Sequence, residues 1–370
     1  MVAVATKGSA AKWLVKDSVE ELAQLAGAAG ADVVGRITQQ LPKPSKTHYL
    51  GKGKLEELQA LKSSTDYNVV IFDDELSPLQ QRNLEEILKV KVIDRAALIL
   101  DVFARRACTR EGQLQVELAQ HQYLSPRLAG QWSHLERLGG GIGTRGPGEA
   151  QIETDRRLIR RKIHNLETQI EGVRKHRELY RHQRRRSGIP IVALVGYTNS
   201  GKSTLLNALT KADVVVEDKL FATLDPATRR FSLPDKSPVL VTDTVGFIRK
   251  LPPAIVTAFR ATLEELSEAS LLVHVVDLSS PSAPEQCQTV EDILAGLSLL
   301  DKQRITALNK IDLLLDRGKT WDEASAIDYF SRRGDVLGKN TVLISVTERW
   351  GLTRLSELIS HTLRQTVSSL

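Results

Sequence analysis

A glycine-rich loop near the middle of the chain has the residue types and spacing that bind phosphate. It reads Gly196, Tyr197, Thr198, Asn199, Ser200, Gly201, Lys202, Ser203 and Thr204. An apolar run at 189–195 predicts a buried strand before it, and a helix is expected at 203–210 after it. In that context, backbone N–H groups and the helix N-terminus can surround phosphate oxygens. Lys202 is expected to reach the β- and γ-phosphates, and Ser203 to place its hydroxyl on Mg²⁺.

A second motif follows the apolar strand expected at 238–242, after a loop that carries Thr223. The motif reads Asp243, Thr244, Val245 and Gly246. The Asp243 carboxylate can hold the hydration shell of Mg²⁺, and the N–H of Gly246 can touch a γ-phosphate. Such a motif indicates a loop that distinguishes a nucleoside triphosphate from a diphosphate.

A third motif has the chemistry that recognises guanine. It reads Asn309, Lys310, Ile311 and Asp312, and it follows an apolar strand at 304–308. A carboxylate at Asp312 can accept hydrogen bonds from N1–H and N2–H₂ of guanine, a pair that adenine cannot offer. Ser345, Val346 and Thr347 are expected to support the base, although GTPases usually have Ser-Ala there. The three motifs in this order predict a guanine-nucleotide switch.

Two positions bear on the hydrolysis step. Phe247 follows Gly246 where Ras-like switches carry a glutamine that orients water. Phenylalanine cannot polarise water, so intrinsic hydrolysis is expected to be slow until a partner or an ion completes the site. Asn199 has two interpretations: it holds a K⁺ beside the phosphates, or it caps its own loop.

Composition limits the class of protein. The 370 residues are 41% hydrophobic and carry a formal net charge of +6, with only two cysteines, Cys108 and Cys287. That cysteine usage favours a reducing compartment without disulfides. No apolar run approaches the 18 or more residues of a membrane span, and the N-terminus makes a poor signal peptide. A cytoplasmic protein is expected.

The predicted fold class is α/β, with three domains. Residues 187–370 are expected to form the P-loop GTPase domain, a mostly parallel sheet with helices on both faces. Residues 1–108 predict a small parallel-sheet α/β domain. Its expected elements are a helix capped at Ser18, strands at 33–37, 69–72 and 90–93, and helices from about Lys54 and from Ser77-Pro78. This domain either binds a second nucleotide at its strand ends or has a structural role.

Residues 109–186 predict a long antiparallel helical hairpin with a glycine-rich tip at 139–148. The second helix has a coiled-coil seam, with spacings of 4, 3, 4 and 3. The seam residues are Ile159, Ile163, Leu166, Ile170 and Val173. We favour a tip that approaches RNA through its backbone and Arg145 over a plain helix connection.

The second hairpin helix is strongly basic. Residues 151–188 contain 12 Lys/Arg and 5 Asp/Glu, a net charge of +7. One cluster spans Arg156 to Lys162, and another spans Arg184 to Arg186. Such a charge run is often only a solvated face, but here its density and the glycine tip favour a phosphate-backbone binder.

Several further stretches make the chain resemble the HflX family of GTPases. They are 48–58, 111–120, the glycine tip through Glu149, and 220–225, which contains Phe221, Ala222 and Thr223. The resemblance implies a GTP-hydrolysing enzyme that binds the 50S ribosomal subunit, with its hairpin reaching toward rRNA near the peptidyl-transferase centre. It also implies that Thr223 closes on Mg²⁺ in the GTP state. Lys202, Thr223 and Gly246 are thus the candidate catalytic residues, and Ser203 and Thr223 the candidate metal ligands.

The chain departs from the family pattern in three places. We expect that it lacks an extra C-terminal domain found in some members. Ala150 and Ile152 replace the common Thr and Leu near the tip, and Val346 replaces Ala. The expected protein is a monomer that splits or rescues stalled ribosomes under stress. The alternatives are an ATP-dependent RNA-remodelling enzyme regulated by GTP, and a module that blocks the large subunit and uses hydrolysis as a timer.

Overall fold

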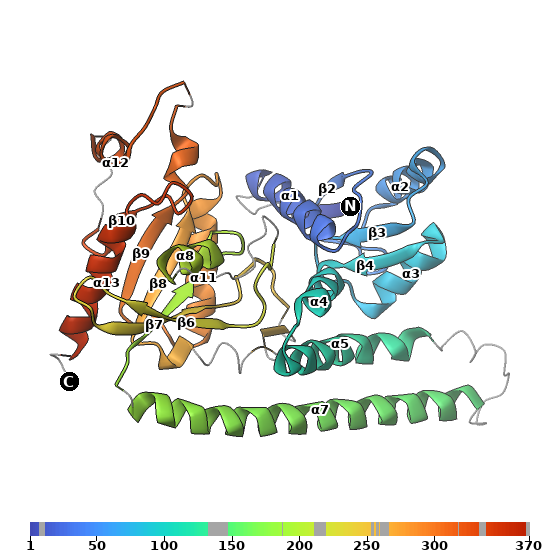
Figure 1. Cartoon of the computed structure of the whole chain (residues 1–370). Helices are drawn as coiled ribbons and strands as arrows, with labels where there is room; N and C mark the ends of the chain where they lie inside the picture. The colour runs from blue at the N-terminus through green and yellow to red at the C-terminus, as the bar shows by residue number, and fades with distance from the viewer. Residues whose placement is uncertain are drawn as a thin grey trace. The chain divides into compact units, whose positions relative to one another are not determined.

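The chain folds into two compact units (Figure 1). The computed structural model describes residues 1–6, 12–131, 147–186, 188–210, 220–252, 255–256, 259, 266–316, 318–332 and 338–367. Unit 1 comprises Met1–Arg174 and Lys250–Ala258, and unit 2 comprises Lys175–Arg249 and Phe259–Leu370. Residues 132–146, which include Arg145 and most of the expected glycine tip, lie outside the described residues, and the last two residues of that tip, Pro147 and Gly148, begin helix α7 (Pro147–Arg186).

Unit 2 is built on a six-stranded sheet of order β10-β9-β8-β5-β7-β6. Its strands are β5 (Ile191–Val195), β6 (Ala227–Ser232), β7 (Pro238–Asp243), β8 (Leu271–Asp277), β9 (Arg304–Asn309) and β10 (Thr341–Leu343). All neighbours are parallel except β6, which pairs antiparallel with β7. The expected mostly parallel sheet is confirmed. Its central strands are apolar throughout because helices cover both faces.

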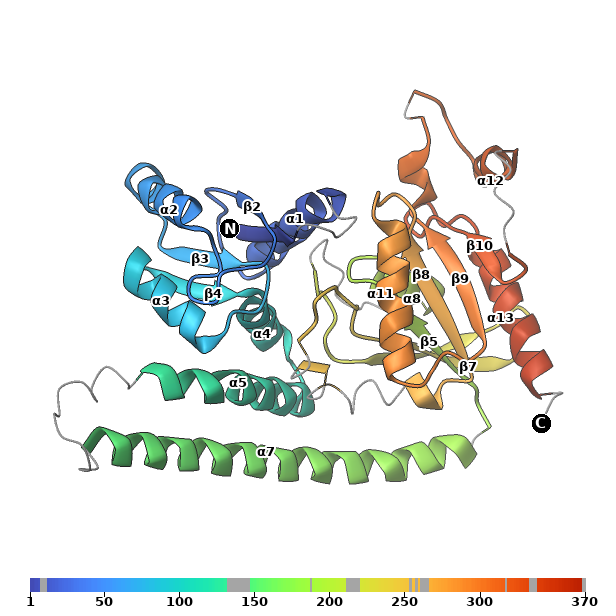
Figure 2. The same ribbon diagram turned by 180° about the vertical axis from the view of Figure 1, so that it is seen from behind.

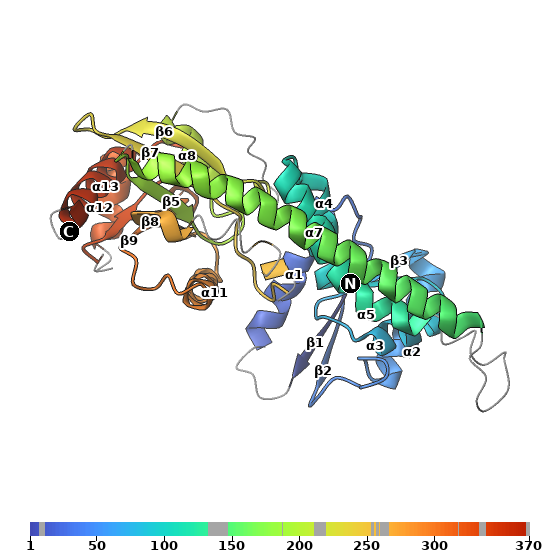
Figure 3. The same cartoon turned by 90° about the horizontal axis from the view of Figure 1, so that it is seen from below.

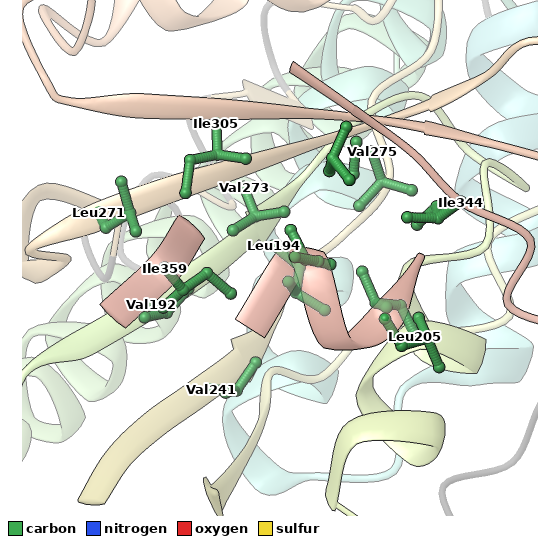
Figure 4. Packing of buried hydrophobic residues seen from close by; sticks show 14 of the residues in the cluster. Val192, Leu194, Leu205, Val241, Leu271, Val273, Val275, Ile305, Ile344 and Ile359 are labelled. Carbon is green, nitrogen blue, oxygen red and sulfur yellow. The ribbon is translucent and has the colours of Figure 1, made fainter. Parts of the chain in front are cut away.

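The two faces of this sheet bury different helices. Leu205 of α8 (Lys202–Thr210) and Ile359 of α13 (Leu352–Val367) join the cluster around Leu194 (Figure 4). On the other face, Leu294 of α11 (Ala283–Gly296) packs with Val195, and Figure 2 shows α11 over that face. Unit 2 also contains η1 (Ile311–Leu314) and α12 (Glu323–Arg332). This packing holds the carboxyl ends of β5, β7 and β9 at one edge, where open α/β sheets bind ligands.

Unit 1 contains a four-stranded parallel sheet of order β2-β1-β3-β4. Its elements are β1 (Val2–Thr6), α1 (Lys12–Ala28), β2 (Ile37–Leu41), α2 (Lys52–Thr65), β3 (Val69–Phe72), α3 (Pro78–Leu88), β4 (Lys91–Asp94) and α4 (Arg95–Arg106). The expected small parallel sheet is confirmed. Ser77 caps α3 as predicted, because its side chain accepts a hydrogen bond from the Gln80 N–H and Pro78 begins the helix.

Two local predictions in unit 1 are wrong. The strand expected at 33–37 begins only at Ile37, and Val33 and Val34 before it are 38% and 57% exposed. The apolar residues at 33–34 belong to a loop. The more polar strand that follows, β2, is an edge strand that pairs with β1, and β1 was not predicted. The helix expected to be capped at Ser18 begins at Lys12, so the Ser18 hydroxyl is free to donate to Asp73.

The hairpin helices are α5 (Arg110–Gln131) and α7 (Pro147–Arg186), which lie side by side in Figures 1 and 3. They run antiparallel, because Glu117 pairs with Lys162 at 2.8 Å while Arg110 bonds Gln169 farther along at 3.2 Å. Seam residues Ile163, Leu166, Ile170 and Val173 pack with Leu114 and Leu118 of α5, and Ile159 is not in that cluster. The seam is thus confirmed for four of its five residues. Within the described part of the chain, no helix is long and apolar enough to cross a membrane.

Candidate nucleotide site

The phosphate loop leaves β5 through a turn that only glycine fits. Gly196 has φ 153°, and a Cβ added there would lie 2.3 Å from the Val275 carbonyl oxygen. Gly201 has φ 98°, and its Cβ would lie 2.3 Å from Nδ2 of Asn309. Both positions combine left-handed backbone with a close approach, so any side chain would displace the loop. The glycines therefore hold the loop against β8 and against the strand that carries the base motif.

Lys202 is held inside this loop. Its side chain is only 5% exposed, and Nζ donates to the carbonyl oxygens of Gly196 at 3.2 Å and Tyr197 at 2.8 Å. Burial lowers the pKa of Lys202 to about 8, although the nearby Asp243 carboxylate opposes the shift. The cost of burying this charge is only partly offset by its neighbours, so the ammonium group is suited to donate hydrogen bonds to anionic oxygens. The position expected to contact the β- and γ-phosphates thus has the electrostatics for that role.

Three oxygen-bearing side chains meet beside Lys202. Ser203 Oγ lies 2.6 Å from Asp243 Oδ2 and 2.7 Å from Thr223 Oγ1. Asp243 is fully buried, its Oδ1 has no hydrogen-bond partner among the described residues, and burial raises its pKa. Hydroxyl and carboxylate oxygens are the ligands that Mg²⁺ prefers. These oxygens fit Mg²⁺: Ser203 and Thr223 would bind the ion directly, and Asp243 would hold its hydration shell.

The loop after β7 is held to the phosphate loop by backbone hydrogen bonds. The Thr198 N–H donates to the Phe247 carbonyl at 2.7 Å, and the Phe247 N–H donates to the Gly196 carbonyl at 3.1 Å. A Cβ on Gly246 would lie 2.7 Å from Thr198 Cα, so glycine is required for this approach. The Phe247 side chain is 2% exposed and packs in the core beneath α11. Phe247 therefore anchors the loop through its backbone and its buried ring.

The loop that carries Thr223 is hydrogen-bonded to the phosphate loop after β5. The Phe221 N–H donates to Thr198 Oγ1 at 2.9 Å, and the Phe221 ring is 1% exposed. Phe221, Ala222 and Thr223 line a small cavity of about 40 Å³ together with the phosphate loop, Thr244 and Gly246. Both loops are thus closed over the phosphate site.

The base motif is tied to the phosphate loop through Asn309. Its Nδ2 donates to the Ser200 carbonyl at 2.9 Å, and its Oδ1 accepts from the Val346 N–H at 3.2 Å. That second bond uses the backbone, so it does not depend on whether valine or alanine stands at position 346. Asp312 Oδ1 is buried without a hydrogen-bond partner among the described residues. This acceptor is what the N1–H and N2–H₂ edge of guanine requires.

The neighbouring residues order this edge. Lys310 has φ 65° and its Nζ lies 2.8 Å from Asp277 Oδ2. Ser345 Oγ accepts from the Glu348 N–H at 3.2 Å and lies 3.1 Å from Thr347 Oγ1. Asp277 was not predicted from the sequence, although its place at the end of an apolar strand was a usable signal.

The chain matches three family models. They are a GTP-binding GTPase N-terminal region at residues 16–104, a GTP-binding GTPase middle region at 106–184, and a 50S ribosome-binding GTPase at 191–310. GTPase HflX of Caldanaerobacter subterraneus subsp. tengcongensis is 54% identical over 299 residues, which are 81% of this chain and 70% of the relative. This chain belongs to the HflX family of GTPases. It binds and hydrolyses GTP.

The likeness to other HflX GTPases extends over the full range of the chain. The Flavobacterium psychrophilum GTPase HflX is 42% identical over 375 residues, 99% of this chain and 90% of the relative. The Escherichia coli K12 GTPase HflX is 46% identical over 300 residues, 81% of this chain and 70% of that one. A crystal structure titled as the SsGBP and GDP complex matches with a TM-score of 0.51 and 25% identity over 98% of both chains. These matches support the HflX-family fold of both units.

Unit 1 of this HflX-family GTPase contains a larger cavity, of about 940 Å³. Met1, Ile37, Val69 and Lys91 line it, so it lies at the amino ends of the four strands. Ligands of open α/β sheets bind at the opposite edge, and no phosphate-binding motif lies here. A second nucleotide at the strand ends of this domain stays a prediction.

Proposed function

We propose that this HflX-family GTPase binds the large ribosomal subunit in its GTP state and splits or rescues stalled ribosomes under stress. The observation that carries the proposal is the exposed cationic surface of α7. Arg156, Arg157, Arg160 and Arg161 are all exposed on that helix, and its apolar seam faces α5. An exposed row of guanidinium groups suits rRNA phosphates. The match to the 50S ribosome-binding GTPase model supports the same partner.

GTP is expected to act through the two closed loops. Lys202 offsets the β- and γ-phosphate charge, Thr223 and Ser203 hold Mg²⁺, and the Gly246 N–H contacts the γ-phosphate. Mg²⁺ when bound neutralises charge that develops on the phosphate oxygens. Because Phe247 is buried in the core, its side chain cannot orient the attacking water as the glutamine of Ras-like switches does. We propose that the ribosome, or a K⁺ held beside Asn199, completes the site.

The test is GTP hydrolysis by the full chain with and without purified 50S subunits, in K⁺ and in Na⁺ buffer. We expect strong stimulation by 50S subunits in K⁺. The variant Arg156→Gln/Arg157→Gln/Arg160→Gln/Arg161→Gln should lose that stimulation while intrinsic hydrolysis stays unchanged, because unit 2 is untouched. A matched control is Arg332→Gln, which removes an exposed arginine from α12.

Absence of stimulation in a folded protein that binds GTP would contradict the ribosomal role. Equal rates in K⁺ and Na⁺ would remove the K⁺ part of the proposal. Full ribosome splitting with a non-hydrolysable GTP analogue would identify hydrolysis as a release timer. The proposal also places the protein in the cytoplasm, as a monomer that meets rRNA near the peptidyl-transferase centre.

A further inference from the structure

The carboxyl edge of the unit 1 sheet holds a buried carboxylate, Asp73, directly after β3. Asp73 is 1% exposed and is bonded on both oxygens. Oδ1 accepts from Arg95 Nη1 at 2.8 Å, and Oδ2 accepts from Ser18 Oγ at 2.7 Å and from Lys250 Nζ at 2.5 Å. β1 and β3 are neighbours here, and the connections from β1 and from β3 run to opposite sides. This is the topological switch point, where open α/β sheets bind ligands. Here the Lys250 side chain of the same chain lies at that point.

The same edge has an excess of negative charge that Lys250 reduces. Asp74 lies 2.6 Å from Lys250 Nζ through Oδ1 and accepts a hydrogen bond from the Tyr49 hydroxyl. Glu21 pairs with Arg95. Asp73 and Glu21 therefore share the buried guanidinium of Arg95, and Asp73 and Asp74 share the ammonium of Lys250. Its removal would leave Asp73 and Asp74 undercompensated in a mostly buried site.

Lys250 reaches unit 1 from an informative place in the sequence. It comes four residues after Gly246, whose N–H is expected to contact the γ-phosphate, yet residues 250–258 belong to compact unit 1. Pro252 and Ile255 of this segment are buried as well, and the Ile255 N–H bonds the Pro252 carbonyl at 2.9 Å. A change in the Gly246 loop is thus separated by only three residues from an anchor in unit 1.

The anchor continues to the hairpin. Arg95, which holds Asp73, follows Asp94 at the end of β4. Asp94 is fully buried and accepts from Tyr123 OH at 2.8 Å and from Arg127 Nη2 at 3.0 Å, both on α5. The guanidinium of Arg127 also stacks 3.5 Å above the Tyr123 ring. Two sets of polar contacts, one around Asp73 and one around Asp94, are therefore joined through the consecutive residues Asp94 and Arg95, and they connect Lys250 to α5 within unit 1.

We propose that Lys250 and its carboxylate partners Asp73 and Asp74 couple the nucleotide state of the Gly246 loop to unit 1, and through Asp94 to helix α5. The contact occurs together with a closed site, in which Thr223 lies on Ser203 and Phe247 is laced to the phosphate loop. On the basis of these loop contacts, we assign the Lys250 contact to the GTP-bound arrangement. By reciprocity, breaking it weakens GTP binding relative to GDP. The inference needs only GTP binding, so it stands or falls separately from ribosome binding.

The experiment measures the affinities of the isolated full chain for GDP and for a non-hydrolysable GTP analogue, using fluorescent nucleotides. Lys250→Ala should lower the ratio of analogue affinity to GDP affinity about 3- to 10-fold, since Lys250 is partly exposed and the coupling lies near the lower end of the usual range. Asp74→Asn should do the same in part. The double variant should match Lys250→Ala alone, because both remove one interaction. Lys250→Arg should restore much of the ratio.

The matched control is Lys54→Ala, which breaks a lysine–carboxylate pair of 2.7 Å with Glu57 on the surface of unit 1. Its nucleotide ratio should equal that of the unchanged protein. A second readout is hydrogen exchange of α5 amides from Gln113 to Arg127, which should slow on addition of the analogue and lose that response in Lys250→Ala. An unchanged ratio in folded Lys250→Ala, an equal change in Lys54→Ala, or additive effects in the double variant would overturn the proposal.

Discussion

The carboxyl edges of the two sheets follow the same topological rule but treat polar groups in opposite ways. In unit 2, buried oxygens of Ser200, Asp243 and Asp312 have no hydrogen-bond partner among the described residues. In unit 1, Asp73 and Asp94 are as deeply buried, yet each accepts hydrogen bonds on both oxygens from the chain itself. A buried polar atom without a partner costs free energy, so it persists where a ligand supplies the partner.

The difference separates a ligand site from an anchor. Unit 2 lines its edge with the glycines of the phosphate loop and with Gly246, beside a small cavity of about 40 Å³. Unit 1 fills its edge with Arg95, Arg127 and Lys250, which neutralise the carboxylates. One edge therefore has the features of a ligand site, whereas the carboxylates of the other are bound by cations of the chain itself.

The largest effect is expected from Lys202→Ala. Removing the buried ammonium takes away the cation that faces the β- and γ-phosphates, so affinity for GDP and GTP should fall by about 100-fold or more. Titration with fluorescent nucleotide measures it, and thermal unfolding checks the fold. Lys319→Ala, at an exposed lysine of unit 2, is the control and should bind normally. Retained GTP hydrolysis in Lys202→Ala would break the assignment of this edge as the ligand site.

The next effect is a change of base preference in Asp312→Asn. The asparagine amide replaces one acceptor oxygen with an N–H donor, which faces the N2–H₂ donor of guanine but matches the carbonyl oxygen that xanthine has there. GTP affinity should therefore fall roughly 100-fold, while xanthosine triphosphate gains affinity. Competition binding with the two nucleotides measures the exchange. Asp316→Asn is the control, because Asp316 Oδ1 accepts only from the nearby Gly318 N–H at 2.9 Å and the amide oxygen can replace it. Equal preference in both variants would place base recognition elsewhere.

Arg127→Ala tests the other edge. It leaves the fully buried Asp94 without its cation, which should lower the free energy of unfolding of unit 1 by about 3–5 kcal/mol. Hydrogen exchange of unit 1 amides in increasing urea measures it, and GDP affinity should stay within about twofold because no ligand group is lost. Arg105→Ala breaks the exposed pair with Asp101 and should cost about 1 kcal/mol or less. A large loss of GDP affinity in Arg127→Ala would show that this edge also takes part in the nucleotide site.

His274 shows a third treatment of a buried ionisable group. Burial on β8 lowers its pKa to about 4, helped by Arg304 and Lys202, so the folded state keeps it neutral. Below about pH 6.5, His274 of the unfolded chain binds a proton that the folded state does not. The folded state is therefore most stable above that pH with respect to this group, and stability is lost as the pH falls toward 4. The loss amounts to at most about 3 kcal/mol. Urea unfolding followed through Trp321 and Trp350 should show that His274→Gln depends less on pH across this window.

Local patterns were enough to predict much of both units. Each nucleotide motif was expected at the end of an apolar strand, and the strands of unit 2 lie where the apolar runs indicated. Seam residues such as Leu166 pack on α5 because a 3.5-residue repeat leaves one face of a helix apolar. The roles of the individual site residues stay predictions, although the fold brings Lys202, Thr223 and Asp243 together.

Local patterns failed where pairing decides structure. Val33 and Val34 have β-favouring side chains, but the strand formed at Ile37–Leu41, where backbone pairing with β1 was available. Ser18 matched a capping pattern, yet α1 extends past it on its N-terminal side. Strand propensity and capping preferences are worth about 1 kcal/mol, which tertiary pairing readily exceeds.

The amino-acid sequence alone predicts the chemistry at the carboxyl edge of the unit 2 sheet. A phosphate loop, a carboxylate after β7 and a carboxylate that recognises guanine each depend on local spacing. Local spacing does not specify that Lys250 meets Asp73 across 177 residues of sequence, or that the Phe247 ring lies in the core. Those outcomes depend on which surfaces pack together and on which buried charges then need a partner. Tertiary packing therefore decided which sheet edge keeps buried oxygens without partners among the described residues and which one has its carboxylates neutralised by the chain itself.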